Sequence, residues 1–240
     1  FLQEELKEVV WSDGTAAIDK ARSVKSVSEQ AMVKKAASLA NLSFRVLSDV
    51  LRPGRTEREV MAEVDRALLS EGAEDIFHLF SSKPGNLFPY VFTDRVIESG
   101  DVVVMNTELS GPGGYWVQMV RMSFVGDAPR KSLKAMYDSL AGIQSQVKMQ
   151  LRPGRKVSEV AGWVRDQIRN CGFDTGVHFG HCLGLDVVEP PLVHLDDNTI
   201  LQPGMVITVH PQFVSRSEQA TVWLGDTYLI TSDSAEVLTE

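Results

Sequence analysis

The chain has 240 residues and a mass of 26.5 kDa, which is enough for one large domain or two small ones. Its 32 Asp and Glu exceed its 24 Lys and Arg, and this acidic balance argues against binding nucleic acid. Ordinary globular composition excludes wholesale disorder, and the absence of a long apolar run excludes a membrane span. Two cysteines make no disulfide framework, so we expect a reducing, cytoplasmic location.

The first helix is predicted from its capping residues. Residues 1–25 are mixed in character, which predicts a linker or the tail of a preceding domain. Ser26 followed by Glu29 forms a capping-box pattern. Apolar residues then recur at helical spacing, which predicts a helix over about 27–50 that Pro53 stops.

A five-residue motif occurs twice, at an offset of 100. Residues 51–55 and 151–155 both read Leu-Arg-Pro-Gly-Arg, and helical patterns flank both copies. After the first copy, Thr56 and Glu59 form another capping-box pattern that begins a helix ending near Gly72. The repetition indicates a duplicated structural unit rather than a solenoid repeat.

The correspondence extends to an apolar strand in each half. Residues 100–106 match residues 204–210, and alternating patterns near 115–125 and 220–230 predict further antiparallel strands. We therefore expect an α+β fold of two pseudo-symmetric halves, about 26–130 and 131–240. Each half would have an antiparallel sheet backed by helices around a shared core.

Polar residues end the two matching strands. Asn106 and His210 are those residues, and the duplication predicts that they face one another across a pseudo-twofold axis. Histidine is the side chain that titrates near neutral pH, so clustered histidines indicate acid–base or ligand chemistry. Four of the five histidines lie between positions 178 and 210: His178, His181, His194 and His210.

Four segments, in order along the chain, resemble the family of aminopeptidase P, prolidase, methionine aminopeptidase and creatinase. Thr93–Asp101 is similar to its TDRVIEKGD segment, and Gly114–Arg121 to its GYxxDxTR segment. Gly180–Pro191 resembles GHGIGLDVHEPP, and Pro203–Pro211 resembles PGMVFTIEP. The resemblance implies the pita-bread fold, a separate N-terminal domain in several relatives, and a homodimer.

The family's metallopeptidases hold two divalent ions with two Asp, one His and two Glu. By this resemblance the five positions are Asn106, Gln118, His181, His210 and Gly225, so only the histidine is kept. Two divalent ions bring about +4 and four carboxylates bring about −4, which normally balances. Here the five positions supply no negative charge, so we expect no dinuclear metal centre and no cofactor. A single zinc on His181 and His210 stays open as an alternative, although two ligands do not fill a tetrahedral site.

Two further family residues are replaced. The catalytic histidine of the family's PHYHPTD segment falls on Pro89, and the histidine of DVHEPP falls on Val188. Both histidines stabilise the gem-diolate in the family's peptidase mechanism, and neither proline nor valine can donate a proton there. The resemblance therefore implies a peptidase site that lacks its metal ligands and its acid–base groups together.

We interpret the chain as a metal-independent, creatinase-like hydrolase or lyase that acts on an amide or amidine C–N bond. His181, His210 and His178 are the candidate catalytic residues. Arg121 is expected to bind a substrate carboxylate, while Asn106 and Gln118 orient a carbonyl or amidine. The expected apolar wall of the pocket is Tyr90, Phe92 and Trp116.

Two alternatives remain open. One is a non-catalytic pita-bread protein that binds a small molecule, a peptide or another protein. The other is an ordinary Xaa-Pro aminopeptidase or prolidase. Convergence of the three histidines favours catalysis, whereas a pocket filled by Trp116 or Trp223 favours binding alone. In each case the expected partner is a small molecule or short peptide, with neither nucleic acid nor membrane involved.

Overall fold

The structure is a computed structural model that describes residues 1–83, 90–175, 178–215 and 220–239. No helix in these ranges is long and apolar enough to cross a membrane. The elements follow the order α1 (Leu2–Glu5), α2 (Thr15–Ser23), α3 (Val27–Val50), α4 (Glu57–Ser70), β1 (Asp75–Ser81), β2 (Val102–Ser110), β3 (Trp116–Phe124), α5 (Lys131–Gln150), α6 (Val157–Asn170), β4 (Gly180–Cys182), β5 (Glu189–Leu192), β6 (Val206–Val209), β7 (Gln212–Ser215), β8 (Ala220–Trp223), β9 (Asp226–Ile230) and β10 (Ala235–Val237).

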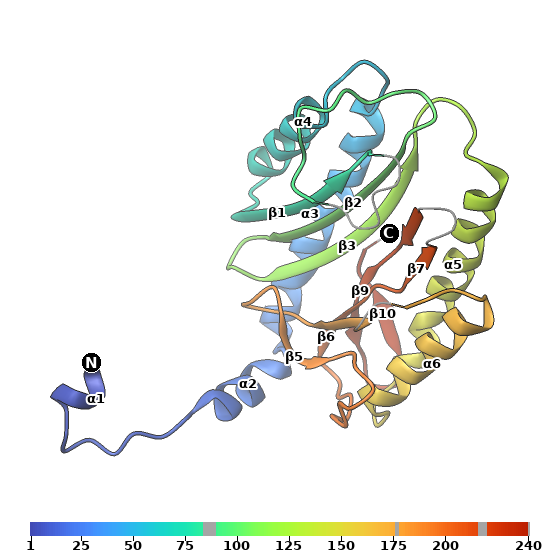
Figure 1. The fold of residues 1–240 in the computed structure, drawn as a ribbon. Coiled ribbons are helices and arrows are strands. Elements are labelled where there is room, and N and C mark those ends of the chain that lie inside the picture. Colours follow the sequence, from blue (N-terminus) through green and yellow to red (C-terminus); the bar gives the residue numbers. More distant parts are fainter. Residues whose placement is uncertain (84–89, 176–177, 216–219, 240) are drawn as a thin grey trace.

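The first half is an antiparallel sheet of order β1-β2-β3 with α3 and α4 packed against it (Figure 1). Both predicted capping boxes are present, so the helix predicted over 27–50 is confirmed as α3. One face of β2 and β3 joins the helices in an apolar core that includes Met105, Leu109 and Met119. The opposite face of β2 and β3 is therefore turned toward the second half.

The second half has a five-stranded sheet of order β10-β9-β6-β4-β5, with β7 and β8 pairing separately. Helices α5 and α6 pack against each other beside it (Figure 1). Its apolar core also takes in Val120 and Met122 from β3 of the first half. The two halves therefore share buried surface, as the duplication predicts.

The duplicated motif forms the same turn in both halves. The N–H of Gly54 donates to the carbonyl of Ile97, and the N–H of Gly154 donates to the carbonyl of Leu201, each at 2.9 Å. Both glycines have positive φ, 90° and 84°, which only glycine adopts without strain. The internal repeat read from the sequence is thus a repeat of backbone structure.

The two sheets join where β3 meets the start of β9. Val120 and Gly225 exchange backbone hydrogen bonds of 3.0 and 3.1 Å. Asn106 lies in the middle of β2, whereas His210 directly follows β6. The expectation that both residues end their strands was therefore wrong for Asn106, because β2 continues into its hairpin with β3 as far as Ser110.

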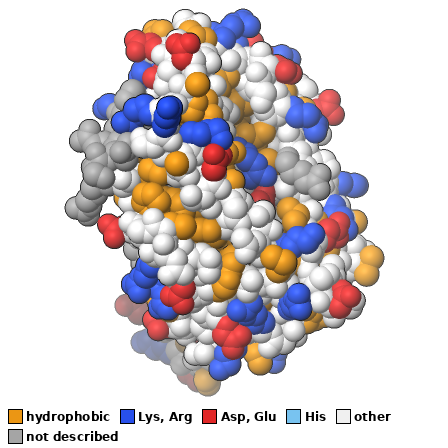
Figure 2. Space-filling model, turned by 90° about the vertical axis from the view of Figure 1, so that its right-hand side faces the viewer, with side chains coloured by type: hydrophobic (Ala, Val, Ile, Leu, Met, Phe, Trp, Pro, Cys, Tyr) orange, Lys and Arg blue, Asp and Glu red, His pale blue; other side chains and the backbone are white. Residues whose placement is uncertain are grey.

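Figure 2 shows one face of the molecule. Apolar side chains form a band down its centre, and basic and acidic side chains are intermingled around that band. No extended basic field covers this face, in keeping with the net charge of −8.

The N-terminal segment that carries α1 extends away from the body of the molecule (Figure 1).

Candidate functional site

Three histidine rings from the second half face one another. The ring centroids are 5.6 Å apart for His178 and His210, 5.7 Å for His181 and His210, and 6.5 Å for His178 and His181. Antiparallel pairing of β4 with β6 sets Gly180 opposite Val209 and so brings the last two rings together. His181 and His210 are buried and His178 is exposed, so the trio reaches from the interior to the surface.

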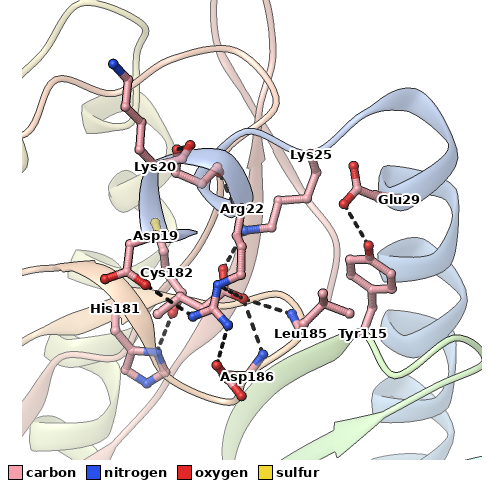
Figure 3. A network of polar contacts seen from close by, with 12 residues as sticks. Asp19, Lys20, Arg22, Lys25, Glu29, Tyr115, His181, Cys182, Leu185 and Asp186 are labelled. Carbon is pink, nitrogen blue, oxygen red and sulfur yellow. Dashed lines mark hydrogen bonds and ion pairs between the residues drawn. The ribbon is translucent and has the colours of Figure 1, made fainter. Parts of the chain in front are cut away.

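The tautomer of His181 follows from its hydrogen bond. Its Nδ1 lies 3.0 Å from the carbonyl oxygen of Cys182, which can only accept, so Nδ1 carries the proton (Figure 3). The lone pair is therefore on Nε2. Burial lowers the pKa of His181 below its usual value, which keeps the ring neutral and Nε2 unprotonated at neutral pH.

His210 is more deeply desolvated. Burial, helped by the neighbouring His181 and His178, lowers its pKa to about 3. The ring of Trp223 lies edge-on at 5.7 Å, and its Nε1–H donates to the backbone carbonyl of His210 at 3.1 Å. His210 is consequently neutral at physiological pH and does not supply a proton as an imidazolium.

A carboxylate that the sequence analysis missed lies beside the predicted amides. Glu108 Oε1 accepts hydrogen bonds from Asn106 Nδ2 at 2.8 Å and from Gln118 Nε2 at 2.9 Å. Gln118 Nε2 also donates to Asn106 Oδ1 at 3.0 Å. Burial raises the pKa of Glu108. The sequence gives little indication that Glu108 is a site residue, because Glu108 is a polar residue inside a strand and belongs to no motif.

The residues at the five family ligand positions do not fit two divalent ions. Asn106 and Gln118 turn their amide N–H groups toward Glu108, and Gly225 has no side chain to offer. A Cβ added at Gly225 would lie 2.6 Å from His210 Cβ, so a side chain there would require residue 210 to shift. Within the described ranges, no group of three or more His, Cys, Asp or Glu is arranged to hold a metal ion.

Arg121 is occupied inside the protein. Its Nη2 donates to Asp226 Oδ1 at 2.6 Å, and its Nη1 donates to the carbonyls of Gly225 and Val120 at 2.8 and 2.9 Å. Asp226 also accepts from Gln144 Nε2 at 2.7 Å. The guanidinium therefore joins β3 to β9, and binding a substrate carboxylate would require it to leave these partners.

The predicted aromatic wall is not assembled as one surface. Tyr90 is 64% exposed, while Phe92 packs on the first-half core with the Arg58 guanidinium 5.8 Å from its ring centre. Trp116 is partly buried, and its backbone N–H donates to the Gly184 carbonyl at 2.7 Å. Trp116 is thus the member of the set that lies against the loop after β4. Pro89, which replaces a family histidine, lies outside the described residues.

The loop between β4 and β5 is held by the N-terminal segment. Lys25 Nζ lies 2.8 Å from Glu189 Oε2, and both side chains are almost fully buried. Glu189 Oε1 accepts from the backbone N–H of Leu185 at 2.9 Å, and Arg22 Nη1 binds Asp186 Oδ2 at 2.5 Å (Figure 3). The part predicted as a linker therefore fixes the loop that follows His181. No local signal links partners 164 residues apart.

Cys182 is a buried thiol. It is fully buried, and burial raises its pKa to about 12. A thiol with so high a pKa is not a thiolate nucleophile at neutral pH. Cys182 packs in the apolar core of the second half.

Comparison with known proteins places these features in a family. The chain is 30% identical over 230 residues to the uncharacterized peptidase YqhT of Bacillus subtilis, and 28% identical over 224 residues to an Xaa-Pro dipeptidase of Pyrococcus furiosus. These alignments cover 93% and 91% of this chain and 64% of each relative. The chain thus spans just under two thirds of the length of these relatives.

Solved structures share the fold. The prolidase from Pyrococcus furiosus matches with a TM-score of 0.86 at 28% identity, over 94% of this chain and 67% of that one. A methionine aminopeptidase from Thermotoga maritima matches with a TM-score of 0.81 at 17% identity, over 91% of this chain and 99% of that one. The predicted α+β pita-bread fold is confirmed. The model of metallopeptidase family M24 matches residues 31–232, and the chain belongs to that family.

Proposed function

We propose that this chain is a metal-independent hydrolase that cleaves an amide or amidine C–N bond of a small molecule or short peptide. The observation that carries the proposal is the convergence of His178 on His181 and His210, which stand at two of the family's five ligand positions. The similarity to M24 relatives supports hydrolysis. Independence from metal rests on the residues at the five positions.

His181 is the proposed general base. Its Nε2 takes a proton from water as the water oxygen bonds to the substrate carbon. The resulting imidazolium then returns that proton to the leaving nitrogen as the C–N bond breaks. A general base is most effective with a pKa near the working pH, so His210 with a pKa of about 3 is the weaker base. As a neutral ring it keeps one N–H, which can polarise a carbonyl or imine.

The similarity to Xaa-Pro dipeptidases favours a second candidate, hydrolysis of Xaa-Pro peptides. A metal-dependent version of that reaction would need a ligand set that the five positions lack. Binding without catalysis is the third candidate, and the edge-on contact of Trp223 with His210 favours it. Assembly as a homodimer and the role of residues 1–25 as a linker stay predictions.

One experiment separates these candidates. The chelator-treated protein is assayed on amides, amidines and Xaa-Pro dipeptides, first without metal and then with added Mn²⁺ or Zn²⁺. Turnover without metal that His181→Ala abolishes supports the proposal. The matched control is His194→Ala, because His194 is outside the trio and contacts Asp196. Turnover only with about two bound metal ions per chain supports the metallopeptidase. Ligand binding without any turnover supports the binding protein.

A further inference from the structure

The buried amide of Gln118 has a fixed orientation. Its Nε2 lies 3.0 Å from Asn106 Oδ1 and 2.9 Å from Glu108 Oε1, and both of these atoms are acceptors. A flipped amide would set its oxygen against two oxygens, so only this orientation is favourable. Gln118 Oε1 therefore points away from the pair of acceptors.

That oxygen has no hydrogen-bond donor within the described part of the chain. Gln118 is 2% exposed, and its Oε1 is buried. A buried acceptor left without a donor is destabilising, so such atoms are rare and need an explanation. An incoming ligand that carries N–H groups would provide the missing donor.

The same cluster has an unpaired negative charge. Glu108 forms no ion pair with any Lys, Arg or His of the described ranges. The basic side chain nearest along β3, Arg121, is already paired with Asp226 at 2.6 Å. One carboxylate oxygen of Glu108 accepts from two amides, which leaves acceptor capacity on the other oxygen.

The cluster borders the histidines. Gln118 and Val120 are two residues apart on β3, so their side chains share one face of the sheet. Val120 Cγ2 lies 3.0 Å from the Cβ position of Gly225, which is itself against His210. A group bound by Gln118 and Glu108 would therefore lie on the sheet face of Val120, which reaches toward Gly225 and His210.

We propose that Asn106, Glu108 and Gln118 form a subsite for an organic cation rich in N–H groups, an ammonium or amidinium group of the substrate. The inference rests on the proposed function, because it names the substrate class of the same site. The carboxylate of Glu108 neutralises the cation, and Gln118 Oε1 accepts one of its N–H groups. Asn106 holds Glu108 in place through the 2.8 Å hydrogen bond.

Binding of small probes tests the subsite without turnover. Acetamidinium and propylammonium are titrated into the full chain, with neutral acetamide as the reference. The side-chain NH₂ signals of Asn106 and Gln118 are followed by ¹⁵N–¹H NMR. We expect both cations to shift these signals saturably and at least tenfold more tightly than acetamide. The stronger of the two cations identifies an amidinium or an ammonium substrate group.

Variants assign the effect to Glu108. Glu108→Gln should weaken cation binding at least tenfold, whereas Glu98→Gln, on an exposed side chain, should leave it unchanged. The comparison of acetamidinium with acetamide in the unmodified protein remains decisive if Glu108→Gln fails to fold. Equal binding of charged and neutral probes, or unchanged binding in a folded Glu108→Gln, overturns the subsite. Either result leaves metal-free hydrolysis standing, and a failure of that hydrolysis leaves the binding result intact.

Discussion

Gly225 lies so close to the side chain of His210 that a side chain at 225 would press against it. A Cβ built on Gly225 would lie 2.6 Å from His210 Cβ and 3.0 Å from Val120 Cγ2. Contacts under 3.0 Å between such atoms force the backbone to move. The family resemblance assigns a ligating glutamate to both positions. In this arrangement a side chain at 225 therefore requires residue 210 to move, so the two positions are coupled by packing.

Substituting Gly225 tests this packing. Gly225→Ala should reduce the free energy of unfolding by about 1–3 kcal/mol, because the added methyl group overpacks a buried junction. The backbone at 225 lies outside the left-handed region, so the cost is steric rather than conformational. Urea denaturation measures it. The matched control is Gly162→Ala in α6, where a Cβ meets nothing within 4 Å. That helical change should stabilise the protein by about 0.5–1 kcal/mol.

A double variant assigns the cost to residue 210. In a His210→Gly background the Cβ that the new methyl group would meet is gone, so the further loss on introducing Gly225→Ala should be smaller. An equal loss in both backgrounds would place the clash elsewhere, on Val120 for example.

Protonation of His210 makes stability depend on pH. Its pKa falls from 6.5 in the unfolded chain to about 3 in the fold, so the unfolded state takes up the proton first. The stabilisation is complete above pH 6.5 and is lost as the pH falls toward 3, by up to about 1.4 kcal/mol per pH unit. His210→Gln should flatten the urea-midpoint profile in that window, while His194→Gln should not. Parallel profiles for the wild type and His210→Gln would contradict the burial of a neutral ring.

Glu108 acts in the opposite direction. Burial raises the pKa of Glu108 above 4.5. Its contribution to the free energy of unfolding is therefore fully present below pH 4.5 and is lost as the pH rises through the folded-state pKa. The effects of His210 and Glu108 on stability overlap in the pH profile of the wild type. They are distinguished by comparing the stability of a His210 variant and a Glu108 variant with that of the wild type at each pH.

Local signals predicted the fold well. The capping boxes at Ser26 and Thr56 indicated the beginnings of α3 and α4, because a cap is satisfied by residues three positions away. The repeated Pro-Gly turns indicated the duplication. The clustering of histidines between 178 and 210 indicated the trio, and the pairing of β4 with β6 brings His181 and His210 together.

Long-range partners explain what the sequence did not reveal. Glu108 became a site residue only through Gln118 on the neighbouring strand. Lys25 acquired a role through Glu189, far along the chain. Arg121 was expected to meet a substrate, but its donors face Asp226 and backbone carbonyls. A sequence pattern shows which atoms a side chain has, whereas its partners depend on tertiary contacts.

The buried pair of Lys25 and Glu189 should be important for stability. Lys25→Met removes the close countercharge of the buried Glu189 carboxylate and leaves only the longer 3.7 Å pair with Arg22 Nε, which should cost about 3 kcal/mol. Adding Glu189→Gln removes the stranded charge and should recover part of the loss, because the amide oxygen can still accept from Leu185. Lys34→Met is the matched control. Its pair with Glu236 has a similar distance of 2.7 Å but is half-exposed, so it should cost less than about 1 kcal/mol.

Hydrogen exchange gives this prediction a local readout. The amide N–H groups of Leu185 and Asp186 both donate to Glu189 Oε1. They should lose protection in Lys25→Met and keep it in Lys34→Met. Unchanged protection in both variants would mean that the N-terminal segment does not hold the loop.

Arg121 distinguishes a structural cation from a substrate-binding one. Arg121→Met should cost about 3–5 kcal/mol, because Asp226 is 8% exposed and would lose its only charged partner within the described residues. Arg121→Met with Asp226→Asn should recover part of that loss. Arg58→Met is the control, since its pair with Asp94 has the same 2.6 Å distance but is largely exposed. If Arg121→Met instead kept full stability and only raised KM for substrates with a carboxylate, the guanidinium would be a substrate ligand. Its contacts with Asp226 and the carbonyls of Gly225 and Val120 would then have to open on binding.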